Sequence, residues 1–154
     1  MPRRANPLKV EAIRALGGQV AFHGRHFEKA RAWAEKHSAR SGLRYVHHIN
    51  EPLLIAGVAT MALEIIEDLP DVEAIVTPVG GGSGAIGHCL VAKALRPNTR
   101  IYAVQAEKAP AAYLSWKKGK LIRAPIATFA EGLATGVAFY TPIRVFRGGS
   151  MIWC

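Results

Sequence analysis

The sequence predicts an α/β fold in which a mostly parallel sheet carries helices on both faces, giving three layers. First, strand-like apolar runs and helical patterns alternate along most of the 154 residues. Second, the spacing of this alternation is typical of a parallel sheet covered by helices. Third, a central apolar run, residues 74–79, breaks into a glycine-rich turn that is followed by a helical pattern.

The helices and strands are predicted from their end signals and their apolar spacing. Asn6-Pro7 can cap a first helix, and Gly17-Gly18 ends it. From residue 119 onward the chain has no clear pattern. The other helical patterns cover residues 27–41, 52–69, 85–95 and 111–118, and strands are expected over residues 19–23, 43–49, 74–79 and 100–105.

The glycine-rich turn, Gly80-Gly81-Gly82-Ser83-Gly84, has the composition of a phosphate-binding loop. Glycines allow a positive φ and a close approach of the backbone to a ligand. The unpaired N–H groups and the dipole of the following helix favour an anion, and the hydroxyl of Ser83 can donate to a phosphate oxygen. The loop therefore predicts a phosphate site, and a plain turn that binds nothing is the less favoured interpretation.

A dinucleotide site is the competing interpretation of the same loop. Gly82, Gly84 and Gly87 satisfy the G-x-G-x-x-G fingerprint, and Glu107 follows at the distance of an acidic ribose partner. The fingerprint normally opens its domain, whereas this loop lies midway along the chain. A glycine run around a single phosphate describes the uninterrupted triplet better.

Composition limits the remaining classes of function. The net charge of +9 comes from basic residues scattered along the chain, which predicts solvated helix surfaces and no nucleic-acid partner. No apolar run is long enough to span a bilayer. Two cysteines, Cys89 and Cys154, form no disulfide framework, which is typical of a reducing cytoplasm. The spacing of the six histidines predicts no metal site; His47 and His48, adjacent on an expected strand, would face opposite ways.

The chain also carries a series of motifs that resembles one enzyme family over most of its length. In order, these motifs are ANPLKVEAIRALGG (5–18), HG-x-x-F-x-x-A (23–30), YVH (45–47), EPLLIAG-x-x-T-x-x-LEI (51–65), PVGGGSGAIG (78–87), VQAE-x-AP-A-YLSW (104–116) and TFAEGLAT (128–135). Together they resemble the central part of a threonine/serine dehydratase (ammonia-lyase) of the tryptophan-synthase-β superfamily, whose members use pyridoxal 5′-phosphate (PLP).

The resemblance implies which residues hold the cofactor. Gly80, Gly81, Gly82, Ser83 and Gly84 would cradle the PLP phosphate, and Glu131 and Gly132 would lie beside its ring. No catalytic residue is assigned, because the motif with the Schiff-base lysine and the motif that grips the substrate carboxylate do not occur in this sequence. No metal is expected, since Gln105 and Ala111 stand where carboxylates would be needed.

The resemblance implies an incomplete fold and a small-molecule function. Residues 1–50 would be a remnant of the family's smaller domain, and residues 51–154 part of its larger, phosphate-binding domain. The family reaction converts L-threonine or L-serine to a 2-oxo acid and ammonia, and this chain is expected to be inactive alone. A non-catalytic phosphate-binding or partner-assembled module is the alternative, and a dinucleotide-binding oxidoreductase domain is the second. Self-association through exposed sheet surface is expected.

Overall fold

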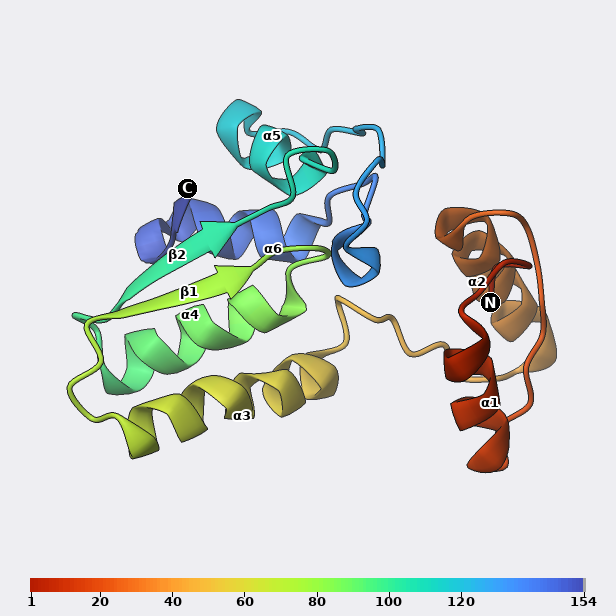
Figure 1. Cartoon of the computed structure of the whole chain (residues 1–154), viewed down its shortest axis with the longest axis horizontal. Helices are drawn as coiled ribbons and strands as arrows, with labels where there is room; N and C mark the ends of the chain where they lie inside the picture. Colours follow the sequence, from red (N-terminus) through yellow and green to blue (C-terminus); the bar gives the residue numbers. More distant parts are fainter. Residues whose placement is uncertain (154) are drawn as a thin grey trace. The chain divides into compact units, whose positions relative to one another are not determined.

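The computed structural model describes residues 1–153 and divides the chain into two compact units, Met1–Val46 and His47–Cys154. Cys154 therefore lies outside the described residues. The first unit holds two helices, α1 (Pro7–Ala15) and α2 (Phe27–Ser41). The second holds the sheet and the remaining helices (Figure 1).

Both helices of the first unit begin and end close to where the sequence predicts. The Asn6 side chain accepts a hydrogen bond from the backbone N–H of Leu8 at 3.0 Å, and Pro7 occupies the first helical position. Gly17, with φ 79°, follows the end of α1, and Gly42, with φ 70°, ends α2. Because a left-handed residue at these sites favours glycine, the end signals were reliable.

The strands expected over residues 19–23 and 43–49 are wrong, since neither segment forms a strand among the described residues. Residues 19–23 are bonded to Met1: its amino group donates to the carbonyl of Ala21 at 2.6 Å, and the N–H of His23 donates to the carbonyl of Met1 at 2.8 Å. Those two bonds are too few for a ladder. Residues 43–47 have no strand neighbour, and a turn follows over residues 48–50.

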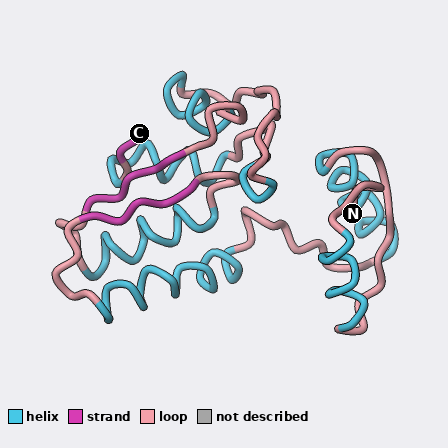
Figure 2. The backbone as a smooth tube through the Cα atoms, viewed as in Figure 1, coloured by secondary structure: helices cyan, strands magenta, loops and turns pink. Residues whose placement is uncertain are grey.

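The second unit confirms the predicted fold class, an α/β arrangement with a parallel sheet. The strand order is β1-β2-β3, and both pairs of neighbours are parallel. Figures 1 and 2 show the elements in chain order, which are α3 (Pro52–Asp68), β1 (Ala74–Pro78), α4 (Ser83–Leu95), β2 (Arg100–Val104), α5 (Ala111–Lys118), the 3₁₀ turn η1 (Glu131–Leu133), α6 (Tyr140–Val145), the π-helical turn η2 (Phe146–Ser150) and β3 (Ile152–Trp153).

Helix α6, strand β3 and the turns η1 and η2 were not expected from the sequence. β3 has only two residues, and it pairs Ile152 with Tyr102 and Trp153 with Ala103. So short a strand cannot display an alternating pattern. Its place is therefore decided by pairing with β2, not by a local signal.

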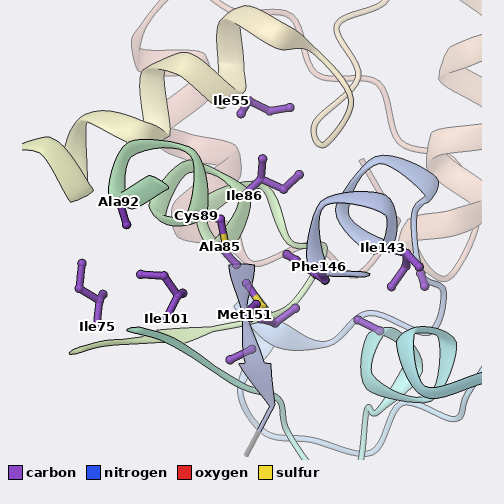
Figure 3. Close-up of a cluster of buried hydrophobic side chains, with 14 residues drawn as sticks. Ile55, Ile75, Ala85, Ile86, Cys89, Ala92, Ile101, Ile143, Phe146 and Met151 are labelled. Atoms are coloured by element: carbon purple, nitrogen blue, oxygen red, sulfur yellow. The ribbon is translucent and has the colours of Figure 1, made fainter. Parts of the chain in front are cut away.

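Helix α4 lies between the sheet and α3, and the core forms around it (Figures 1 and 3). α3 approaches α4 closely at Gly87, where a Cβ would lie 2.8 Å from the Cα of Ala59. The core cluster consists of Ile55, Ile75, Val79, Ala85, Ile86, Cys89, Ala92, Ile101, Ala103, Ala112, Ala138, Ile143, Phe146 and Met151.

Strand β1 is buried on one face only. Ile75 and Thr77 point into the core, whereas Val76 on the other face is 66% exposed. The strands of a parallel sheet are ordinarily covered on both faces. Within the described residues the second face of β1 lacks such a cover, which fits an open, incomplete sheet.

Candidate phosphate-binding site

The glycine loop connects the end of β1 to the start of α4. The N–H of Val79 donates to the carbonyl of Val104 at 2.8 Å, which extends the pairing of β1 with β2 to the edge of the loop. Gly82 is the N-cap of α4 with φ 104° and ψ 2°, and Ser83 is the first helical residue. The strand end and the helix start thus lie together at the carboxyl edge of the sheet, where open α/β sheets bind ligands.

A continuous run of backbone N–H groups lacks acceptors in this loop. The first hydrogen bond of α4 runs from the N–H of Ile86 to the carbonyl of Gly82, at 2.9 Å. In the chain as described, residues 1–153, the amides from Gly80 to Ala85 have no hydrogen-bond acceptor. These donors and the positive end of the α4 dipole make the loop suited to an anion.

The chain itself occupies the space beside the three consecutive glycines. A Cβ on Gly80 would lie 2.8 Å from the carbonyl oxygen of Gly132, and a Cβ on Gly82 would lie 2.8 Å from the Cβ of Pro142. A Cβ on Gly81 would overlap the side chain of Ile49. Sequence reasoning attributed these glycines to the close approach of a ligand. The structure gives an additional reason, because protein atoms press on the loop at each position.

The other residues proposed from the sequence lie in three different settings. Ser83 and Gly84 are half-buried at the start of α4, and a Cβ on Gly84 would meet only the Met61 side chain, at 3.7 Å. Gly132 is brought to the loop, since its carbonyl oxygen packs against Gly80. Glu131 begins the η1 turn and is exposed.

The side chains that pack against Gly81, those of Ile49 and Phe139, were not identified from the sequence. Ile49 contacts Gly81, and the ring of Phe139 lies 3.7 Å from where a Cβ of Gly81 would stand. His47 and His48 do not face opposite ways on a strand, as was expected. Their rings stack at 4.8 Å and both meet Phe139 edge-on, at 5.5 and 5.3 Å. The signal available was His47 two residues before Ile49, a spacing that permits a side-chain-capped turn.

Below the loop, buried polar groups are satisfied within the core. The Nδ1 of His88 on α4 lies 2.9 Å from the Thr77 hydroxyl on β1, and both side chains are buried. Burial lowers the pKa of His88, so the neutral imidazole is favoured there. Burial also raises the pKa of Cys89 to about 11, which makes its thiol a poor nucleophile.

Neither a buried lysine nor a cluster of metal-ligating side chains occurs among the described residues. Every lysine of the chain is exposed to solvent. Across residues 1–153, no three His, Cys, Asp or Glu side chains gather closely enough to hold a metal ion. In the same part of the chain, no helix has both the length and the apolar character that a membrane span requires.

Comparisons with known proteins agree with this geometry. A family described as "Pyridoxal-phosphate dependent enzyme" matches residues 1–150. The chain is 38% identical over 148 residues to an L-threonine ammonia-lyase of Geobacter sulfurreducens, covering 94% of this chain and 37% of that protein. It is 39% identical over 135 residues to the L-threonine ammonia-lyase of Thermotoga maritima, covering 87% of this chain and 34% of that protein.

A solved structure shows the same fold. The processed form of threonine deaminase isoform 2 from Solanum lycopersicum superposes with a TM-score of 0.88 at 31% identity, over 100% of this chain and 46% of that one. The chain thus spans less than half the length of these relatives. Pyridoxal phosphate is the cofactor of the family whose pattern it carries. On the sequence match, the shared fold and the glycine loop together, the chain belongs to the pyridoxal-phosphate-dependent enzymes and is similar to the threonine dehydratases among them.

Proposed function

We propose that this chain binds the phosphate of pyridoxal 5′-phosphate through the backbone of Gly80–Gly84, with the hydroxyl of Ser83 as a further donor. The observation that carries the proposal is the run of amides from Gly80 to Ala85 without acceptors at the start of α4. A phosphate dianion satisfies several such donors at once and is stabilised by the helix dipole. The residues present therefore fit the phosphate end of the cofactor.

Glu131 and Gly132 are proposed to lie beside the cofactor ring. The contact of the Gly132 carbonyl with Gly80 supports this, because it brings the TFAEGLAT segment against the loop. From the resemblance to the threonine dehydratases we also propose that residues 1–50 belong to a smaller domain and residues 51–154 to the phosphate-binding domain.

The proposed activity of the protein to which this sequence corresponds is the dehydration of L-threonine or L-serine to a 2-oxo acid and ammonia. The relatives named for this reaction support it. Bound PLP supplies an electron sink for the bond broken at the substrate Cα. The residues of this chain contribute binding and orientation, since the amides hold the phosphate end in place.

We expect this chain alone to give no turnover. The reaction needs an amine whose surroundings keep it unprotonated near neutral pH. All the lysines of this chain are exposed. A phosphate cradle by itself binds ground state and transition state alike, and uniform binding does not raise kcat.

A second candidate is a phosphate-binding module that works with a partner chain or a second copy. The uncovered face of β1, with Val76 66% exposed, favours this candidate because an exposed apolar sheet face tends to associate. Sedimentation of the isolated chain tests it, with dimers or larger species as the expected result. A monomer at all concentrations would argue against it.

The test of the phosphate site is a pair of substitutions at one position. Ser83→Asp places a carboxylate at the first residue of α4, where an acid stabilises the helix by about 0.3–1 kcal/mol but repels a phosphate. Ser83→Asn has similar size and no charge. We expect PLP to shift the amide resonances of residues 80–85 in the unsubstituted protein, weakly in Ser83→Asn, and not in Ser83→Asp.

Two controls complete the test. NAD titrated in parallel distinguishes a dinucleotide site. One sample incubated with PLP is assayed for 2-oxo acid formation without reduction, and a parallel sample is reduced with borohydride so that lysine adducts can be mapped. Equal PLP affinity in Ser83→Asp and the unsubstituted protein would overturn the cradle. One stoichiometric lysine adduct together with turnover would overturn the expectation of inactivity.

A further inference from the structure

We propose that His47 is a positioning residue for the glycine loop: its side chain holds the turn that places Ile49 against Gly81. This inference rests on the proposed phosphate site and concerns how the loop of that site is held in shape. It joins two segments that are distant in the sequence and lie in the same unit of the structure.

The side chain of His47 organises the turn that precedes α3. Its Nδ1 accepts hydrogen bonds from the backbone N–H groups of Ile49 and Asn50, each at 3.1 Å. The backbone carbonyl of His47 accepts a third bond, from the N–H of Glu51 at 3.2 Å. An Nδ1 that accepts two bonds carries no proton, so the ring proton is on Nε2.

The turn delivers one buried side chain to the loop. Ile49 is only 5% exposed, and its side chain fills the space in which a Cβ of Gly81 would stand. The second neighbour of Gly81 is Phe139, whose ring is packed edge-on by both histidines. Turn and ring together form the wall of the loop, and a loop rich in glycine needs such a wall because its backbone has little preference of its own.

Titratable groups lie beside His47 in this turn. His48 stacks on it at 4.8 Å, and Glu51 lies in the same turn. The N-cap residue of α6, the uncharged Phe139, meets the ring edge-on, and Tyr140 follows it as the first residue of the helix. Protonation of His47 at Nδ1 would remove the acceptor for both amides.

This mechanism predicts that anion affinity changes with pH in the opposite direction to that expected from charge attraction by the histidines. If His47 and His48 acted on an anion only by their charge, affinity would rise as the pH falls. If His47 acts by holding the turn, affinity falls as the pH falls, because the protonated ring releases Ile49 and Asn50. Sulfate is the appropriate probe, since it keeps one charge state between pH 5.5 and 8 whereas phosphate does not.

Asparagine is the conservative replacement that separates the two roles. Its side-chain oxygen can accept the same two amides, as in an Asx turn, and it does not titrate. The full chain is compared with His47→Asn, His47→Ala and His48→Asn by sulfate titration at pH 5.5 and pH 8, reading the amides of residues 80–85. Urea unfolding of each variant checks that it is folded.

We expect the unsubstituted protein to bind sulfate more weakly at pH 5.5 than at pH 8, and His47→Asn to lose that dependence while keeping affinity within about threefold at pH 8. His47→Ala should bind about tenfold more weakly at pH 8, as expected for the loss of two hydrogen bonds. If His47→Ala does not fold, the pH profile of His47→Asn decides.

The outcomes distinguish this inference from the proposed function. No binding of sulfate or PLP to the unsubstituted protein at either pH would overturn the phosphate site itself. Binding that strengthens as the pH falls, or an unchanged pH dependence in His47→Asn, would overturn the role of His47 alone. If the pH dependence disappeared only in His48→Asn, the effect would belong to His48, and the role of His47 would likewise be overturned.

Discussion

Replacing Gly82 by alanine should strongly destabilise the second unit, for two reasons that the structure supplies. Gly82 has φ 104°, a conformation that costs a non-glycine residue about 1–3 kcal/mol. The added Cβ would also lie 2.8 Å from the Cβ of Pro142 and 3.1 Å from the ring of Phe146, a buried residue. Forcing an extra group into a packed site costs about 1–3 kcal/mol more.

Together the two contributions should lower the free energy of unfolding by about 2–6 kcal/mol, compared with a total of about 5–15 kcal/mol for a typical protein. With a urea m-value of about 2 kcal/mol per M, the unfolding midpoint should fall by about 1–3 M. The assay is urea denaturation followed by circular dichroism. Anion binding should weaken in parallel, because Gly82 caps α4 and shapes the loop.

Gly57→Ala is the matched control. Gly57 lies inside α3, and a Cβ there would have no neighbour within 4 Å. Alanine in an exposed helix interior should therefore raise stability by about 0.5–1 kcal/mol. If Gly82→Ala and Gly57→Ala changed the unfolding midpoint alike, the argument from conformation and close contact at Gly82 would be refuted.

Three further results are expected from the buried groups below the loop. Thr77→Val should lower the free energy of unfolding in urea by about 1–3 kcal/mol, because it leaves the Nδ1 of buried His88 without its partner. An unchanged free energy would mean that the pair contributes nothing to stability. Burial lowers the pKa of His88 in the folded state, so the unfolded state takes up the proton first as the pH falls below 6.5, and the free energy of unfolding decreases. His88→Gln should remove this part of the slope of unfolding free energy against pH. In a Cys154→Ser background, Cys89, whose pKa is raised to about 11, should react with thiol reagents at the rate of unfolding, and rapid labelling of the folded protein would contradict its burial.

Local signals predicted α1 to α5 and the central strands well, whereas α6 lies in the part of the chain where no pattern was recognised. Asn6 caps α1 by its side chain, as its position before Pro7 indicates, and Gly17 and Gly42 follow the ends of their helices in left-handed conformations. The strand before the glycine loop and the helix after it were also predicted. In each case the information lies within a few residues of the feature it determines.

The segments that were predicted wrongly or missed depend on neighbours distant in the sequence. Residues 43–49 have the apolar residues of a strand but find no strand to pair with, and His47 caps a turn there instead. The sequence of β3 has no strand pattern, and the segment is a strand only because its backbone pairs with β2. A strand requires a partner for its backbone groups, and a propensity alone cannot supply one.

The sequence by itself determined the family, the α/β class and the position of the glycine loop, because strand, glycine turn and helix follow one another directly along the chain. Only the tertiary structure decided how that loop is held. Ile49 fills the space beside Gly81, Gly132 presses on Gly80 and Pro142 on Gly82. Each contact joins segments far apart in the chain, and close packing between such segments arises only once the sheet and its helices have assembled.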